Sequence, residues 1–384
     1  MGTAHHYNRP RDRTILRRSG RLGVFESIGT DTHEEVLFGQ DPASGLRTIV
    51  AIHNTALGPA LGGTRFFPYQ TEHDALIDVL RLSKGMTLKS AAAGLDLGGG
   101  KAVIIGDPRA MGTERLFRAY GRVVDSLGGR YITAEDVGTT PENMAIIARE
   151  SNWVTGLPSF EGGSGDPSPA TARGVMAAMR AVANRLWNTQ DLAGKKVAIQ
   201  GVGKVGMDLL RRLTESGVET VVADAHPDAV TEAVETYGSK AVAVDEIHDV
   251  DCDIFAPCAL GACLSESTIA RLRCEAVVGS ANNQLAIDDD ADLLVGRGIL
   301  YAPDFVVNAG GIINIYVEMD GYEVKRASAL IDAIYDNVNR VLDAAEADGV
   351  NPHVAAVRVA EERIQDVGSL RLKRRPGHHR GVLK

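Results

Sequence analysis

The segment Val197-Ala-Ile-Gln-Gly-Val-Gly-Lys-Val-Gly206 joins a short apolar run to a G-x-G-x-x-G pattern. The apolar run predicts a buried strand, and the residues after the glycines predict a helix over 207–216. In such a unit the first glycine makes the turn, the second admits a pyrophosphate to the backbone, and the third packs helix on strand. The helix N-terminus then faces the anion. The segment therefore predicts a dinucleotide-binding unit of an α/β fold.

The next predicted strand, 220–223, is followed by Asp224, 18 residues after Gly206. A carboxylate there can accept hydrogen bonds from the adenine ribose hydroxyls and would repel a 2′-phosphate, which favours NAD over NADP. No arginine directly follows it, although His226 is close. The alternative is a glycine-rich turn beside a solvated aspartate. The nucleotide-contacting residues expected from this segment are Gly201, Val202, Gly203, Lys204, Val205, Gly206 and Asp224.

Strands and helices also alternate outside this unit. Upstream we expect strands at 35–38, 48–53, 102–105 and 131–133, a helix that begins at the N-cap Thr71, a glycine-rich loop at 94–100 and a helix at 114–127. A hinge at 162–169 is expected from its Gly and Pro content, followed by helix 171–186 and, from residue 326 onward, amphipathic helices. This order predicts two domains: a mixed α/β substrate domain (1–159 plus 346–384) and a Rossmann-type domain (160–345) with a cleft between them.

Composition indicates a globular protein. Of 384 residues, 44% are hydrophobic and 24% charged, and no apolar run reaches the roughly 20 residues that span a bilayer. The arginine-rich start is not followed by an apolar stretch, so no secretory signal is expected. The four cysteines lack zinc-like C-x-x-C pairs, which favours reduced core thiols in a cytoplasmic protein.

The net charge of −9 is unevenly spread. Residues 1–21 carry six arginines against one aspartate, and residues 371–384 carry six basic residues, so the body between them is strongly acidic. An acidic body argues against a nucleic-acid binder. The basic ends are expected to be solvated tails.

Two lysines precede the hinge. Lys89 continues an apolar helical stripe through Leu82 and Met86, and Lys101 follows three glycines that leave room for a ligand. Two amines near one pocket would lower each other's pKa and make a neutral amine available as a base. Asp136 follows a predicted strand, where a loop can bring its carboxylate to the same place. Taken singly, each of these is more often a surface charge.

Eight motifs together resemble the glutamate/leucine/phenylalanine/valine dehydrogenase family, and look most like its leucine and valine enzymes. They are Gly62-Gly-Thr-Arg65, Gly85-Met-Thr-Leu-Lys89, Gly94-Leu-Asp-Leu-Gly-Gly-Gly-Lys101, Thr133-Ala-Glu-Asp-Val-Gly138, Gly201–Gly206, Ala256-Pro-Cys-Ala-Leu-Gly261, Ser280-Ala-Asn-Asn-Gln284 and Asn308-Ala-Gly-Gly311. The resemblance runs from about residue 57 to residue 311, and the two ends lie outside it.

The resemblance implies that Lys101 activates water and that Asp136 shuttles protons to and from the amine. It implies that Lys89 binds the substrate carboxylate with help from Asn283. Further substrate contacts implied in the same way are Leu61, Gly62, Gly63, Met86, Ile312 and Ile315. The implied cofactor contacts beyond the glycine turn are Arg65, Thr171, Ala259, Ala281, Asn282 and Asn283. The reaction implied is oxidative deamination of an L-amino acid to a 2-oxo acid and ammonia by a homo-oligomer.

The implied substrate is apolar. Glutamate enzymes of the family carry a lysine where this chain has Leu61, and tend to have a serine where it has Ile315. An apolar lining cannot compensate a buried carboxylate, so glutamate is disfavoured and leucine, valine or isoleucine favoured. Tyr316 leaves an aromatic substrate such as phenylalanine open. An alternative of another class is an inactive NAD-binding sensor or scaffold, against which the retention of both lysines and Asp136 argues.

Overall fold

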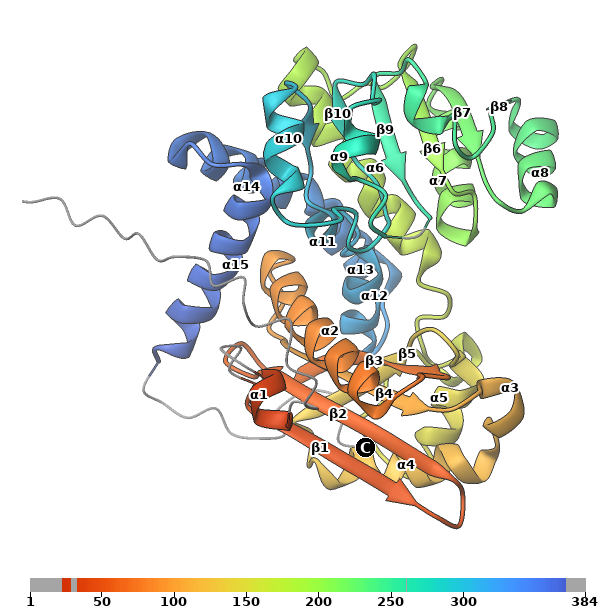
Figure 1. The fold of residues 1–384 in the computed structure, drawn as a ribbon, viewed down its shortest axis with the longest axis vertical. Coiled ribbons are helices and arrows are strands. Elements are labelled where there is room, and N and C mark those ends of the chain that lie inside the picture. Colours follow the sequence, from red (N-terminus) through yellow and green to blue (C-terminus); the bar gives the residue numbers. More distant parts are fainter. Residues whose placement is uncertain (1–22, 29–32, 260, 371–384) are drawn as a thin grey trace, which may run out of the picture.

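The computed structural model describes residues 23–28, 33–259 and 261–370. The two basic ends lie outside these residues, so the expected tails stay a prediction. Figure 1 shows two lobes, each built around its own β-sheet. The expected two-domain α/β architecture, with one mixed and one parallel sheet, is confirmed.

The first lobe holds a five-stranded mixed sheet of order β1-β2-β4-β3-β5. Its strands are β1 (Glu35–Asp41), β2 (Leu46–Asn54), β3 (Ala60–Phe67), β4 (Gly98–Ile105) and β5 (Tyr131–Glu135). β1 and β4 run antiparallel to β2, while β3 runs parallel to both β4 and β5. The helices of this part of the chain are α1 (Val24–Ile28), α2 (Glu72–Ala92), α3 (Pro108–Met111), α4 (Glu114–Ser126) and α5 (Pro141–Ile147).

This sheet is buried on both faces. Apolar residues of α2 such as Leu76 and Val79 pack on Ile49 and Val103 of one face. Residues of α4 and α5, including Phe117 and Ile147, cover the other face. Thr71 caps α2 as expected, and its hydroxyl accepts a hydrogen bond from the amide of Asp74 in a capping box. The sheet and α2 thus form the rigid base from which the site residues project.

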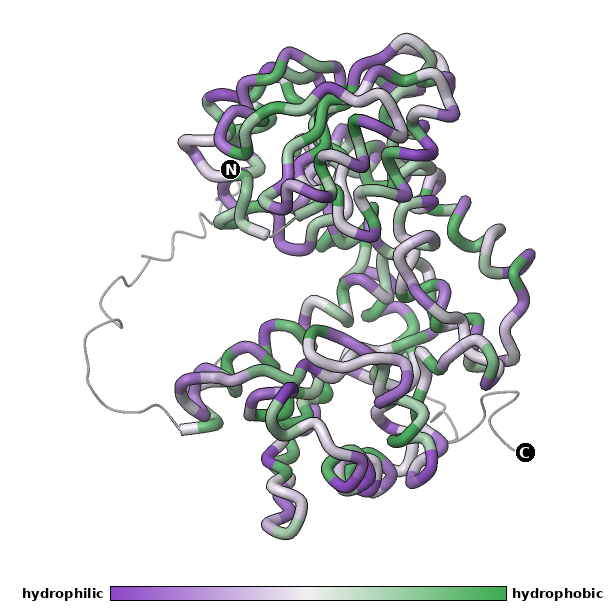
Figure 2. Tube along the Cα trace, turned by 90° about the vertical axis from the view of Figure 1, so that its right-hand side faces the viewer, coloured by the Kyte–Doolittle hydropathy of each residue, from purple (hydrophilic) through white to green (hydrophobic). Residues whose placement is uncertain are grey.

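The second lobe holds a six-stranded parallel sheet of order β11-β10-β9-β6-β7-β8. Its strands are β6 (Lys196–Gln200), β7 (Glu219–Ala223), β8 (Lys240–Ala241), β9 (Ile254–Pro257), β10 (Ala276–Val277) and β11 (Leu300–Tyr301). Counted from β6, this is the 3-2-1-4-5-6 order of the Rossmann fold. Helices α6 (Ser168–Trp187) and α7 (Lys204–Glu215) pack together beside the sheet. In Figure 2, hydrophobic segments run through the interior of this lobe.

The remaining helices belong to the second half of the chain. They are α8 (Pro227–Tyr237), α9 (Glu266–Ile269), α10 (Asp290–Gly296), α11 (Asp304–Val307), α12 (Gly310–Glu318), α13 (Val324–Asp332), α14 (Ile334–Asp348) and α15 (Pro352–Gly368), with short 3-10 turns at Ser159–Glu161 and Ile247–Asp249. α14 packs on α6, and α15 continues to α2 of the first lobe. There Arg363 donates hydrogen bonds to the carbonyls of Gly94 and Leu95. The C-terminal helices therefore brace one lobe against the other.

Two expectations about glycine-rich segments are wrong. Gly98, Gly99 and Gly100 begin β4 and are not part of a loop. A Cβ on Gly99 would lie 2.1 Å from the backbone nitrogen of Thr87, so this glycine lets α2 lie directly on the strand. The helix expected at 207–216 instead begins at Lys204, because Gly203 serves as its N-cap and Gly206 lies inside it. The other expected strands and helices are present within a few residues of their predicted bounds.

Candidate active site

The close packing of β3, β4 and β5 places the candidate catalytic groups. A Cβ on Gly62 would lie 1.8 Å from the carbonyl oxygen of Gly100, and one on Gly63 would lie 2.3 Å from that of Glu135. Only glycine permits this approach. Gly62 and Gly63, which were expected to contact the substrate, therefore lie inside β3. In the structure their lack of a side chain allows the neighbouring strands to approach closely.

Lys101 and Asp136 form the centre of the site. Lys101 projects from β4 with 5% of its surface exposed, and its Nζ lies 2.9 Å from Oδ2 of Asp136 just after β5. The same Oδ2 accepts a 3.0 Å hydrogen bond from Nε of Arg65 on β3. Burial alone raises the pKa of the Asp136 carboxyl, but the two cations outweigh it and hold that pKa below its ordinary value. Asp136 is thus an ionised carboxylate shared by two cations.

Lys89 lies near this pair, on the last turn of α2. Burial lowers the pKa of its ammonium to about 8. Asp304 raises that pKa, Lys101 lowers it and Asp136 raises it, so these charges lie within range of one another. Its Nζ donates a 2.9 Å hydrogen bond to Oδ1 of Asn282, which comes from the second lobe. The structure therefore brings together Lys89, Lys101 and Asp136, as the sequence predicted.

Asn308 and Asp304 are site residues to which the sequence analysis gave no role. The buried amide of Asn308 donates to Oδ1 of Asn282 at 2.9 Å and to the carbonyl of Ser280 at 3.1 Å. Asp304 accepts from the backbone of Gln284. Together they fix the segment 280–284 that contacts Lys89. Asn308 is the first residue of the Asn308–Gly311 family motif, so the sequence could have indicated it, whereas no motif or pattern indicates Asp304.

The glycine turn after β6 has the geometry that a pyrophosphate requires. Gly201 has φ +99°, and a Cβ on Gly206 would lie 2.1 Å from the carbonyl of Gly201, which explains both glycines. A Cβ on Gly203 would meet nothing within 4 Å. The open side therefore lies at the N-terminus of α7, where the backbone amides face outward. These residues fit a dinucleotide.

The carboxylate expected at the ribose lies beside this turn. Oδ2 of Asp224 accepts a 2.8 Å hydrogen bond from the amide of Val202, and Oδ1 accepts one from the amide of His226. Each oxygen keeps a lone pair for a further donor. Val205 packs beside the core, and Lys204 forms a 3.1 Å ion pair with Asp166 of the expected hinge.

Several expected cofactor contacts gather around the same edge. The Cβ of Ala259 lies 2.7 Å from the point where a Cβ on Gly201 would be. Thr171, near the start of α6, lies against Gly311 of α12. Ala281 is buried, and Asn283 is exposed with φ +51°. Arg65 lies apart from this edge: it is on β3 of the first lobe and pairs there with Asp136 and Asp78.

An apolar layer lies next to the lysines. Leu61 is fully buried and Ile312 is 5% exposed, and both belong to one hydrophobic cluster that spans the lobes. Met86, Ile315 and Tyr316 pack on this cluster and are half-buried. The positions expected to line a side-chain pocket are therefore apolar and contiguous.

The four cysteines divide between this site and another place, since the Cβ of Cys258 lies 3.6 Å from the point where a Cβ on Gly206 would be. They are free thiols, and Cys252 and Cys274 line a cavity of about 460 Å³ at the amino ends of the parallel strands, opposite the glycine turn. Burial raises the pKa of each of these two thiols to about 12. Among the described residues, no group of three or more His, Cys, Asp and Glu side chains is placed to hold a metal ion. No described helix is long and apolar enough to cross a membrane.

Comparison with known proteins shows to which family this chain is similar. Residues 33–153 match the Glu/Leu/Phe/Val dehydrogenase dimerisation domain, and residues 162–230 and 224–371 match the Glutamate/Leucine/Phenylalanine/Valine dehydrogenase model. Leucine dehydrogenase of Geobacillus stearothermophilus is 51% identical over 93% of this chain and 98% of its own length. Valine dehydrogenase of Streptomyces virginiae is 48% identical over 87% and 94%.

A solved structure has the same fold. L-tryptophan dehydrogenase from Nostoc punctiforme superposes with a TM-score of 0.79 at 43% identity, over 89% of this chain and 99% of that one. The matches to the family models cover both lobes, including the segments that carry Lys101 and the glycine turn. The chain therefore belongs to the glutamate/leucine/phenylalanine/valine dehydrogenase family and is an amino-acid dehydrogenase.

Proposed function

We propose that this chain catalyses the reversible, NAD-dependent oxidative deamination of an apolar L-amino acid, with leucine, valine or isoleucine preferred, to the 2-oxo acid and ammonia. The observation that carries the proposal is the buried Lys101–Asp136 pair beside Lys89. Two amines and one carboxylate can hold an amino acid's carboxylate, activate a water and move protons at the amino group. When bound, NAD supplies the hydride acceptor.

Each residue takes one task in this reaction. Lys89 pairs as a cation with the substrate carboxylate, and Asn282 and Asn283 approach from the other lobe. Lys101 first passes its ammonium proton to Asp136, 2.9 Å away, and the neutral amine then takes a proton from the attacking water. Asp136 in turn exchanges the proton it has received with the substrate nitrogen. Because Lys101 is buried and Asp136 is half-buried, water screens the charges of the pair only weakly, which strengthens them.

The preference for an apolar side chain rests on Leu61. It is fully buried in the same hydrophobic cluster as Ile312, so a substrate carboxylate placed against it would lose its hydration without gaining a cation. Such a loss costs several kcal/mol, which disfavours glutamate. Ile315 and Met86 extend the same apolar surface.

An aromatic substrate is the second candidate. Tyr316 packs half-buried against the hydrophobic cluster that contains Ile312, where it could shape the pocket. The likeness to an L-tryptophan dehydrogenase also supports it. Size alone separates such substrates by only about 1–3 kcal/mol per methylene.

The preference for NAD rests on Asp224. Its carboxylate lies beside the glycine turn, bound to the amide of Val202, where it can accept the ribose hydroxyls. A 2′-phosphate at that place would face a negative charge. Arg65, Thr171 and Ala259 are proposed as further contacts of the cofactor.

Further proposals concern the organisation of the protein. We propose that residues 1–159 with 346–384 form the substrate domain, that 160–345 form the cofactor domain, and that the chain works as a homo-oligomer in the cytoplasm. α15 packs on α2, in support of this division. The dimerisation domain matched by residues 33–153 supports the oligomer. The free thiols are in keeping with a reducing compartment.

The deciding experiment follows NADH absorbance at alkaline pH with a panel of L-amino acids. We expect leucine, valine or isoleucine to give the highest kcat/KM, phenylalanine or tryptophan less, and glutamate none. A flat trace with every amino acid, while NAD still binds, would show an inactive NAD-binding protein instead. Lys101→Ala should abolish turnover while NAD binding persists, and unchanged activity would remove the proposed role of Lys101.

A further inference from the structure

The guanidinium of Arg65 lies between two carboxylates. Its Nε donates to Oδ2 of Asp136 at 3.0 Å, and its Nη1 donates to Oδ2 of Asp78 at 2.8 Å. The first carboxylate belongs to the proposed catalytic pair, whereas the second comes from the second turn of α2 and has no role in the reaction proposed above. Asp78 therefore binds Arg65 on the side away from the Lys101–Asp136 pair.

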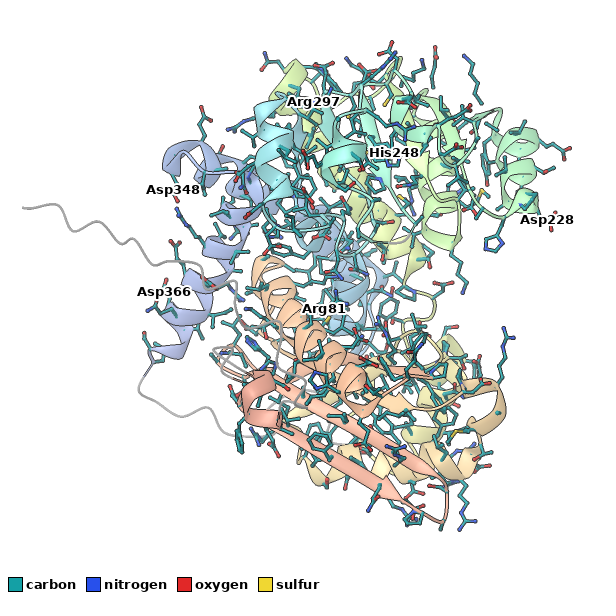
Figure 3. All side chains as sticks on the ribbon, viewed as in Figure 1. Arg81, Asp228, His248, Arg297, Asp348 and Asp366 are labelled. Carbon is teal, nitrogen blue, oxygen red and sulfur yellow. The ribbon has the colours of Figure 1, made fainter. Side chains whose placement is uncertain are left out.

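Asp78 is itself held in place. Its Oδ2 also accepts a 2.7 Å hydrogen bond from the hydroxyl of Tyr69, and its Oδ1 accepts one of 3.2 Å from Arg81. The Asp78 side chain is 15% exposed, while that of Arg81 is 64% exposed (Figure 3 labels Arg81 on α2). Burial and the neighbouring Asp78 raise the pKa of Tyr69, so its hydroxyl stays protonated and donates. The contact from Tyr69 is thus sheltered, and the contact from Arg81 is in solvent.

We propose that Asp78, supported by Tyr69, is a positioning residue that holds Arg65 against Asp136. The proposal rests on the roles given above to Lys101 and Asp136. An arginine side chain has several rotatable bonds, and with one carboxylate partner it samples many orientations. With a second carboxylate at 2.8 Å on its other side, the planar guanidinium has one preferred orientation.

The consequence for the reaction runs through Asp136. Its Oδ2 receives both Arg65 and Lys101, so the direction of the Arg65 hydrogen bond helps fix the carboxylate in front of Lys101. If Arg65 turns away, the half-buried carboxylate of Asp136 loses one of its two side-chain donors and can rotate. Small displacements of a catalytic group cost up to about 100-fold in rate. Asp78 thereby affects turnover without touching the reacting atoms.

The test begins with four single substitutions in the full-length enzyme at saturating NAD. Asp78→Asn should lower kcat/KM for the preferred amino acid by about tenfold or more, because a neutral amide holds a guanidinium poorly. Tyr69→Phe should give a smaller loss in the same direction. Asp78→Glu should recover part of the activity, since it keeps a carboxylate. Arg81→Ala, the matched control, removes only the exposed partner of Asp78 and should change kcat/KM less than twofold.

A double-substitution cycle separates positioning from general damage. On an Arg65→Ala background, Asp78→Asn should cause less than a twofold further loss, because its effect passes through Arg65. Equal losses on both backgrounds, or full activity of Asp78→Asn, would overturn the proposal. Should Asp78→Asn not fold, Tyr69→Phe is carried through the same cycle and decides in the same way. The Lys101→Ala variant tests the proposed active site separately. If it still turns over substrate, the proposed site is wrong. If it is inactive, the site stands, and the double-substitution cycle tests only the role of Asp78.

Discussion

Nζ of Lys89 donates a 2.9 Å hydrogen bond to Oδ1 of Asn282, and this contact joins α2 of the first lobe to the segment after β10 of the second. The same Oδ1 accepts from the amide of Asn308, so the ammonium meets a fixed acceptor. The amine proposed to bind the substrate carboxylate is therefore seated where the two lobes meet. A substrate carboxylate bound to Lys89 would therefore be within reach of residues from both lobes.

The lowered pKa of Lys89 predicts how carboxylate binding depends on pH. Below pH 8 the ammonium is charged and pairs with a carboxylate, and above pH 8 it loses the charge. The inhibition constant of 4-methylpentanoate, a leucine skeleton without the amino group, should therefore rise about tenfold per pH unit above roughly pH 8. Inhibition kinetics from pH 6 to 10 measure this.

Two variants check that the effect belongs to Lys89. Lys89→Met should bind the analogue weakly at every pH in the range. Lys101→Met should move the rise to higher pH, because the charge of Lys101 is one of the causes that lower the pKa of Lys89. An inhibition constant that stays constant across pH in the unsubstituted enzyme would contradict the assignment.

The same amine, half-buried where the lobes meet, should cost stability. Its pKa is about 8 in the folded protein against 10.5 for a free lysine, so below pH 8 the folded state bears the full cost of a buried charge. That cost is relieved as pH rises from about 8 toward 10.5. Lys89→Met should thus raise the free energy of unfolding by about 1–3 kcal/mol at pH 7, and by less at pH 10.

Urea denaturation at the two pH values measures this difference. Lys325→Met, on the exposed side of α13, is the control and should change stability by less than about 0.5 kcal/mol. A loss of stability in Lys89→Met at pH 7 would mean that the bond to Asn282 outweighs the desolvation of the amine.

The sequence predicted the positions of the three ionisable groups because each follows from local pattern. Lys89 continues a helical stripe, Lys101 follows three glycines just before a predicted strand, and Asp136 follows another. The structure has Lys89 on α2, Lys101 inside β4 and Asp136 directly after β5. Arg65 was assigned to the cofactor by resemblance, and that assignment stays a prediction. Its bond to Asp78 could not be foreseen, because it depends on how α2 lies across β3.

The misplaced glycines have a different cause. Glycine is normally read as a turn signal, but Gly98, Gly99 and Gly62 lie within strands that press against a helix or a neighbouring backbone. Close approach in tertiary packing has no local signature that separates it from a loop. The same ambiguity hid β3 altogether: no strand was predicted over the residues that include Leu61 and Arg65.

The apolar lining predicts the outcome of adding a charge at residue 61. Leu61→Lys buries an amine among aliphatic side chains, so we expect the free energy of unfolding to fall by about 3 kcal/mol. The kcat/KM for leucine should fall more than tenfold, and the ratio of glutamate to leucine turnover should rise. Leu61→Met keeps volume and polarity and should cost less than about 1.5 kcal/mol. Leucine kinetics that Leu61→Lys leaves unchanged would place the side chain away from the substrate.

The glycine turn allows one substitution to report on folding and another on the cofactor. Gly203 is the N-cap of α7, a position that favours serine, and a Cβ there meets nothing within 4 Å. Gly203→Ser should therefore leave the melting temperature unchanged, yet raise the dissociation constant for NAD at least tenfold, because the new side chain fills the space proposed for the pyrophosphate. Gly206→Ser places its Cβ 2.1 Å from the carbonyl of Gly201 and should lower stability by about 1–3 kcal/mol. Thermal unfolding and calorimetric titration with NAD measure the two effects. If Gly203→Ser binds NAD as the unsubstituted chain does, the pyrophosphate lies elsewhere and the proposed cofactor site is wrong.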